Sequence, residues 1–291
     1  MWRFFVFDRF SIFIKIFTLK NKLLLIIALI IVSGVSLYFY KDSDRNIRLK
    51  DNIIINHSLT TGNKQIVDFY MPQIGVNQVV NHEIYTLSYN ETHEQADWVA
   101  YKLYKNSINE SVKRRDNFRQ DPLIVTESAT LSDYKKSGYD RGHLAPAKTM
   151  SFSKQTMNES FFMSNMSPQL PSFNRGVWKR LEERVRQWIK VSDSLYVVTG
   201  PVLKDSLGFI GENKVTIPNA YYKVVIRFKN KNLTGIGFLL NNKKSSERIS
   251  TFTVAIDSIE EITGINFFYK LNIEEQNRIE KNTSFNSFLK E

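Results

Sequence analysis

The chain has 291 residues, of which 42% are apolar and 24% are charged, a composition typical of a folded domain with a sizeable core. It contains no cysteine, which excludes disulfides, a thiol nucleophile, iron–sulfur clusters and zinc sites built on cysteine. The formal net charge is +11, and residues 1–50 supply +6 of it. The remaining residues are mildly basic, which permits a polyanionic partner without requiring one.

The first notable element is an uncharged run over residues 23–40, LLLIIALIIVSGVSLYFY, which reaches the minimum length for a helix that crosses a bilayer. Lys and Arg gather before the run, so residues 1–22 are predicted to be a cytoplasmic basic segment and the remainder to be exported, into the periplasm or outside the cell. The alternative is a cleaved signal peptide and secretion, but the run is long and lacks a small-residue cleavage site. The sequence therefore favours a single-pass membrane anchor, followed by a polar linker over residues 41–65.

Residues 66–291 are predicted to form one domain in which strands outnumber helices. Aromatic and β-branched residues predict strands at 96–104 and 194–202. Two further strands, 220–228 and 233–240, form a predicted hairpin because a short polar turn separates them. Adjoining strands of this kind favour an α+β class over a doubly wound sheet.

Two helices are predicted in this domain. Apolar residues recur at helical spacing within residues 175–190, which indicates an amphipathic helix whose Trp178 belongs to the core. Asp257 followed by Glu260 resembles a capping box, and the glycine after residue 263 resembles a stop signal, so a short helix is expected over 258–263.

The most distinctive segment is GYDRGHLAP, residues 138–146. Its His143 suits proton abstraction because an unperturbed imidazole titrates near neutral pH. Downstream, Asn174 and Glu182 carry oxygen atoms of the kind that a hard divalent cation prefers. If a regular helix extended back to Asn174, the two residues would lie about 80° apart around its axis and roughly 12 Å along it. Glu182 would then reach the cation through a bound water.

Basic residues around this segment suit phosphate. Arg114 or Arg115 could hold a phosphate in a bidentate contact, and the sequence leaves open which of the two does so. Arg186 follows Glu182 by one helical turn and could pair with it or with phosphate. Together, a base, a cation site and arginines suit attack of water on a phosphodiester.

Several motifs in this order resemble the DNA/RNA non-specific endonuclease family, the ββα-metal (His-Me finger) nucleases that include secreted bacterial nucleases and mitochondrial endonuclease G. The resemblance covers about residues 68–285. It implies an α+β domain with a central antiparallel sheet. The matching residues are Arg114 four before Phe118, Asp140-Arg141-Gly142-His143, Ser164 to Gln169, Asn174 with Trp178, and Leu181-Glu182.

The resemblance also implies a chemistry. His143 would be the general base, Asn174 the sole direct protein ligand of one Mg²⁺ ion (or Mn²⁺ in its place), and Glu182 a metal partner through water. The implied activity is metal-dependent cleavage of DNA and RNA without sequence preference, leaving 5′-phosphate ends.

Four further site residues come from the same resemblance. Arg114 and Arg186 would contact phosphate. Asn165 would steady the active-site loop. Arg141, with Asp140, would shape the turn that presents the histidine, and Arg141 would lie close to phosphate or substrate.

Simpler structural interpretations of these residues are also open. Asn174 could be a helix N-cap, Glu182 and Arg186 a solvated pair on a helix surface, and residues 113–115 a solvated charge run. For the whole chain, the alternative is a catalytically silent, membrane-anchored module for nucleic-acid binding or uptake on the same fold. A metallophosphatase is disfavoured because clustered His and Asp ligands are missing. The other three histidines, His57, His82 and His93, are expected to be ordinary surface or linker residues. The sequence gives no oligomeric state.

Overall fold

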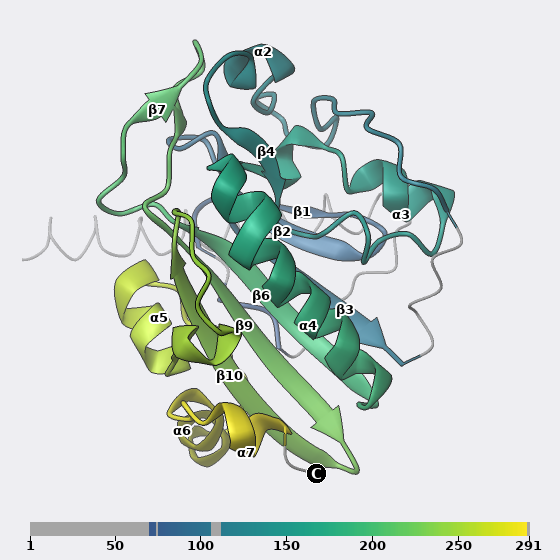
Figure 1. Ribbon diagram of the computed structural model, residues 1–291, viewed down its shortest axis with the longest axis vertical. Coiled ribbons are helices and arrows are strands. Elements are labelled where there is room, and N and C mark those ends of the chain that lie inside the picture. Colours follow the sequence, from purple (N-terminus) through teal and green to yellow (C-terminus); the bar gives the residue numbers. More distant parts are fainter. Residues whose placement is uncertain (1–69, 74, 106–111, 290–291) are drawn as a thin grey trace, which may run out of the picture. The chain divides into compact units, whose positions relative to one another are not determined.

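A seven-stranded antiparallel sheet forms the centre of a computed structural model that describes residues 70–73, 75–105 and 112–289 (Figure 1). The strand order is β1-β2-β3-β6-β9-β10-β11. The predicted α+β class with a central antiparallel sheet is thereby confirmed. The strands of this sheet are β1 Gln78–Asn81, β2 Tyr85–Asn90, β3 Gln95–Tyr104, β6 Ser194–Val202, β9 Ala220–Lys229, β10 Asn232–Asn241 and β11 Thr253–Val254.

All four predicted strands are present in this sheet. The predicted hairpin is β9 and β10, whose register begins at the pair Lys229 and Asn232. The connecting turn is therefore only Asn230 and Lys231, and both residues have positive φ, +49° and +66°. Two-residue turns of this conformation match the right-handed twist of the strands that they join.

Both faces of the sheet are apolar, and successive side chains along a strand point to opposite faces. On β9, Tyr221 and Val225 belong to one hydrophobic cluster, whereas Tyr222 and Val224 belong to the other. Such alternation follows from the two-residue period of a strand. Because both faces are apolar, helices must cover both of them.

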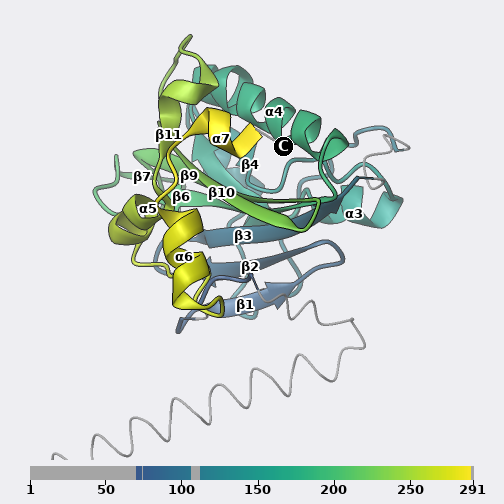
Figure 2. The same ribbon diagram turned by 90° about the horizontal axis from the view of Figure 1, so that it is seen from below.

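Helices α4, Lys179–Lys190, and α7, Phe285–Leu289, contribute to the first cluster, and α5, Ile256–Thr263, and α6, Ile273–Glu280, to the second. Figure 1 shows α4 lying across the sheet, and Figure 2 shows α4 and α6 at different sides of the strands. The remaining elements are α2 Leu131–Tyr134, β4 Asp140–His143, α3 Lys154–Glu159, a 3₁₀ turn Met163–Asn165, β5 Met166–Gln169, a π turn Phe173–Trp178, β7 Phe209–Ile210, β8 Val215–Thr216 and a 3₁₀ turn Ile249–Phe252.

Both predicted helices exist with different beginnings. The helix expected over 175–190 starts as a π turn, its backbone departs from helical geometry at Gly176, and the regular α4 begins at Lys179. The helix expected over 258–263 is α5, and Gly264 ends it in the left-handed conformation at φ +72°, as predicted. The capping box is wrong, because the Glu260 carboxylate instead accepts a hydrogen bond from the Phe267 N–H at 2.7 Å.

Two short strands outside the central sheet precede α4. β4 and β5 pair antiparallel, with His143 opposite Met166 and Gly142 opposite Ser167. A Cβ atom at residue 142 would lie 2.2 Å from Cδ of Gln169, so a larger residue would fit only if the buried Gln169 side chain shifted. Two strands followed by a helix are the arrangement that the resemblance implied, and they bring the motif around His143 beside the start of α4.

One expectation about histidines is wrong. His82 is buried, and its Nε2 lies 2.9 Å from Oδ2 of Asp121, which also accepts a hydrogen bond from Ser164. His93 is half-buried, with Nδ1 2.9 Å from Oγ1 of Thr216. Both rings find partners more than 35 residues away, so neither is an ordinary surface residue.

The predicted anchor at residues 23–40 lies outside the described residues, as do segments 1–22 and 41–65 and His57. Among the residues that are described, no helix has the length and apolar character to cross a membrane. The anchor and the predicted export therefore stay predictions from the sequence.

Candidate active site

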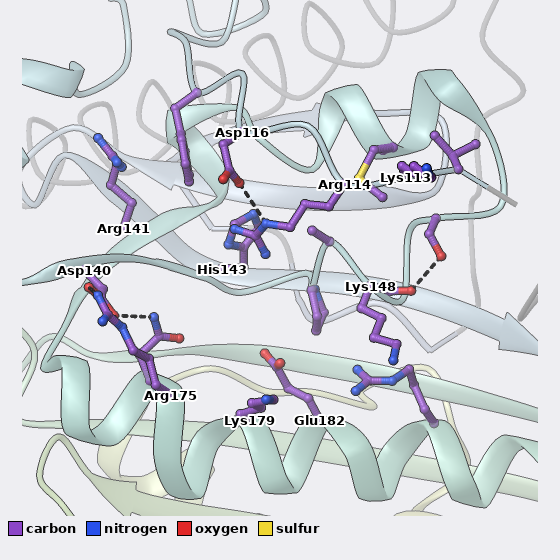
Figure 3. A pocket seen from close by; sticks show the side chains of 18 residues that line it. Lys113, Arg114, Asp116, Asp140, Arg141, His143, Lys148, Arg175, Lys179 and Glu182 are labelled. Atoms are coloured by element: carbon purple, nitrogen blue, oxygen red, sulfur yellow. Dashed lines mark hydrogen bonds and ion pairs between the residues drawn. The ribbon is translucent and has the colours of Figure 1, made fainter. Parts of the chain in front are cut away.

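A cleft of about 990 Å³ lies beside β4 and the first turns of α4 (Figure 3). Seven Lys and Arg residues and three carboxylates line it, so the cleft is strongly basic. Such a surface attracts a polyanion. Six of the seven predicted site residues line this cleft, and they are Arg114, Arg141, His143, Asn174, Glu182 and Arg186.

The last residue of β4, His143, is only 9% exposed and packs edge-on against Phe161, with 4.9 Å between ring centroids. Its Nε2 atom is buried without a hydrogen-bond partner among the described residues. Burial, together with the charges of Arg114 and Arg141, lowers the pKa of His143 to about 3. The imidazole is therefore neutral at neutral pH, which is the state that can accept a proton.

We expect the His143 ring to stay neutral in the folded protein at pH 5, where a histidine with an ordinary pKa of about 6.5 is mostly charged. The unfolded chain takes up this proton near pH 6.5 and the folded chain only near pH 3, so the contribution of His143 to the free energy of unfolding falls as pH drops between these values. Ring nitrogen shifts in a long-range ¹H–¹⁵N NMR titration measure the charge directly. A His143 ring that titrates near pH 6.5 would contradict the expectation.

Asn165 lies behind the cleft and does not line it. Its amide Nδ2 donates hydrogen bonds to the carbonyl oxygens of Ala145 and Ser160 at 3.0 and 2.8 Å, and its Oδ1 accepts one from the Ala145 N–H at 2.8 Å. The Leu144 N–H also donates to the Asn165 carbonyl at 3.0 Å. The segment that directly follows His143 is therefore fixed by one fully buried amide.

Replacing Asn165 by alanine is expected to lower the free energy of unfolding by about 2–4 kcal/mol, because buried N–H and carbonyl groups lose their partners. Urea denaturation measures this loss. The matched control is Asn219→Ala, because Asn219 is exposed, and its effect should stay within about 0.5 kcal/mol. An effect at Asn165 as small as that of the control would show that the amide does not hold this segment.

Asn174 lies in the π turn and is half-buried. Its Nδ2 donates a hydrogen bond to Oδ2 of Asp140 at 2.9 Å, and Arg175 donates to both oxygens of the same carboxylate at 2.9 and 2.6 Å. Although burial raises the pKa of Asp140, these bonds hold it below its ordinary value. Because the amide nitrogen faces Asp140, the amide oxygen is the atom left to hold a cation. The alternative of an N-cap is wrong, since Ser172 occupies that position.

Glu182 projects from the first turn of α4 into the cleft (Figure 3). No ion pair or side-chain hydrogen bond of its carboxylate is found within the part of the chain that the structure describes. Burial raises the pKa of Glu182 to about 7, against the opposing charges of Lys223 and Arg186. A carboxylate held without a partner, on the same wall as a free amide oxygen, is an oxygen donor set of the kind that suits Mg²⁺.

The helix segment between these two donors differs from the sequence-based expectation. The values of 80° and 12 Å assumed a regular helix, and the π turn with the break at Gly176 removes that premise. The solvated pair of Glu182 and Arg186 is also wrong. No ion pair joins these two described residues, Arg186 is 9% exposed, and its Nη1 is buried without a partner.

The structure distinguishes the two neighbouring arginines. Arg114 lines the cleft and Arg115 does not. The Arg114 Nε donates a hydrogen bond to Asp116 at 2.7 Å, and its guanidinium lies 5.1 Å from the Phe161 ring centroid. Arg141 similarly stacks over Phe118, at 4.2 Å from the centroid. Both guanidinium groups are therefore held beside His143 by aromatic rings.

Residues 62–273 match the family model described as DNA/RNA non-specific endonuclease. The chain belongs to this family. It is therefore a nuclease, an enzyme that hydrolyses phosphodiester bonds.

Relatives and a solved structure agree with this assignment. "Nuclease C1" of Cunninghamella echinulata is 33% identical over 211 residues, which cover 67% of this chain and 84% of the relative. Human mitochondrial endonuclease G is 32% identical over 214 residues, covering 66% and 70%. A crystal structure of the EndoG/EndoGI complex matches with a TM-score of 0.66 and 33% identity over 72% of this chain and 91% of the solved one.

The nuclease cleft also contains basic residues that were not predicted as site residues, namely Lys113, Lys148, Arg175 and Lys179. Lys179 could have been predicted from the sequence, because it precedes Glu182 by three residues and so shares its helix face. Behind the same wall lies Lys223, fully buried, with Nζ 3.0 Å from Oγ1 of Thr199 and 4.6 Å from the Trp178 ring centroid. Burial lowers the pKa of Lys223 to about 8, while Glu182 opposes this shift.

Proposed function

We propose that this nuclease is a metal-dependent endonuclease that cuts DNA and RNA without sequence preference and leaves 5′-phosphate ends. One observation carries the proposal. A neutral, buried His143 and a Glu182 without an ion-pair partner among the described residues line the same basic cleft (Figure 3). A base that is already unprotonated and an oxygen site for a cation are the two groups that phosphodiester hydrolysis by water needs.

His143 is the proposed general base. Its neutral imidazole can take a proton from the attacking water, and the positive charge that the ring then acquires is balanced by the phosphate. Asn165 acts through the backbone, because it holds the residues that follow His143 in place. A general base must be held in position, and this fixed segment supports that role for His143.

Asn174 is the proposed direct protein ligand of one Mg²⁺ ion, or of Mn²⁺ in its place, and Glu182 the partner that holds a metal-bound water. The Asp140 carboxylate orients the Asn174 amide so that its oxygen is available. When bound, the ion supplies positive charge to the phosphate and to the departing oxygen. The oxygen-only donor set supports a hard cation over zinc.

Arginines provide the phosphate contacts in this proposal. Arg114, Arg141 and Arg186 line the cleft, and a guanidinium can bind two phosphate oxygens at once. These groups address phosphate and carry no information about base sequence, which supports action on DNA and RNA alike.

A cleavage assay tests the proposal against the alternative of a silent nucleic-acid-binding or uptake module. Supercoiled plasmid and single-stranded RNA are incubated with the full-length protein and Mg²⁺, and in parallel with a chelator. We expect both substrates to be cut only with the metal. Binding of either substrate without metal-dependent cleavage would favour the silent module.

A further inference from the structure

Three carboxylates meet far along the chain from the cleft residues. Asp257 and Glu260 project from α5, Glu280 is the last residue of α6, and one oxygen of each lies within 4.8 Å of the others. These helices pack on the second face of the sheet, whereas α4 packs on the first. Glu280 also lies beyond residue 273, where the match to the family model ends.

The buried member of the cluster is Glu280, which is only 6% exposed. Its Oε1 has no hydrogen-bond partner among the described residues. An unpaired buried carboxylate is costly, because the desolvation of its charge is not offset. Like charges on Glu260 and Asp257 add to this cost, so the group requires either a proton or a cation.

The arrangement of the other two carboxylates fits a cation. Glu260 is held in place by the hydrogen bond that one of its oxygens accepts from the Phe267 N–H. Asp257 is more exposed, which leaves room for water ligands. Oxygen ligands lie about 2.3–2.6 Å from Ca²⁺, so two ligands of one ion are at most about 5 Å apart, in agreement with the separation of up to 4.8 Å observed here.

We propose that Asp257, Glu260 and Glu280 form a second cation site, of the Ca²⁺ type, which ties helix α5 to helix α6. The site is separate from the proposed catalytic metal and does not depend on it. Its occupation would stabilise the C-terminal helices, since a ligand that binds only the folded chain raises its stability.

The proton is the competing explanation, because burial, with Glu260 and Asp257, raises the pKa of Glu280 to about 7. The test uses the full-length Asn174→Ala protein, which lacks the proposed ligand of the catalytic metal. Its thermal unfolding is followed as CaCl₂ is added. NaCl at matched ionic strength is the salt control. We expect the melting temperature to rise by about 3–5 °C at a Ca²⁺ concentration ten times the Kd. Calorimetric titration should give one Ca²⁺ per chain at this site.

Further variants in the same Asn174→Ala background test whether the rise in melting temperature comes from the three carboxylates. Glu280→Gln and, separately, Asp257→Asn should abolish the rise, whereas Glu274→Gln, a change at an exposed residue of the same helix, should retain it. Asp257→Asn alters a partly exposed residue, so it remains informative if Glu280→Gln fails to fold. A rise no greater than that in NaCl, or a full rise in both site variants, would overturn the proposal and leave Glu280 as a protonated acid.

Discussion

Replacing His143 by alanine is expected to lower the rate of plasmid cleavage by about 10²–10⁴-fold, the range typical for loss of a general base. The ring is neutral at neutral pH because burial and two nearby arginines lower its pKa, and a phosphate bound between the ring and those arginines would raise its affinity for a proton. Among the described residues that line the cleft, His143 is the one histidine, and Glu182 is proposed to act on the cation. Initial rates with saturating Mg²⁺ measure the effect.

Binding and folding should survive this change, because the arginines proposed to contact phosphate remain. His93→Ala is the matched control, since this half-buried histidine contacts Thr216 and does not line the cleft. The control should cut at the wild-type rate. A His143→Ala protein with full turnover would remove the proposed base.

Replacing Asn174 by alanine is expected to raise the Mg²⁺ concentration for half-maximal cleavage by at least about 10–100-fold, the range seen when groups that support a metal ligand are lost. The reason is that a single amide oxygen is proposed as the only direct protein ligand, with Glu182 acting through water. Cleavage rates across a Mg²⁺ titration measure this shift.

Asn219→Ala serves as the control for the same chemical change, because Asn219 is exposed and outside the cleft. It should leave the Mg²⁺ titration unchanged. If Asn174→Ala also left the titration unchanged, Asn174 would not be the metal ligand.

The strands could be predicted from sequence because β-branched and aromatic residues gather in runs of strand length, as in β6 and β9. The beginning of α4 could not be predicted from the sequence. Apolar spacing shows which residues of a helix face the core, but a π turn keeps Trp178 and Leu181 in the core while changing the direction of Asn174. π turns are often found at functional sites, and here the turn sets the amide against Asp140.

Most of the candidate site could be predicted from sequence motifs, because its residues come from a few short segments. Two features depended on tertiary contacts and were missed or left open. His82 is paired with Asp121, 39 residues away, and the sequence carries no signal for that contact. The choice between Arg114 and Arg115 depends on which side chain the fold turns toward the cleft, and adjacent residues of the same type look alike in sequence.

In the proposed reaction, a phosphodiester lies between the imidazole of His143 and a cation held by Asn174. A crystal structure of the His143→Ala protein with Mg²⁺ and a short DNA duplex tests it most directly. We predict the ion on the amide oxygen of Asn174, one backbone phosphate bound to the ion, and the space of the missing ring beside that phosphate. An ion that does not contact Asn174, or DNA bound outside the cleft, would rule out this arrangement.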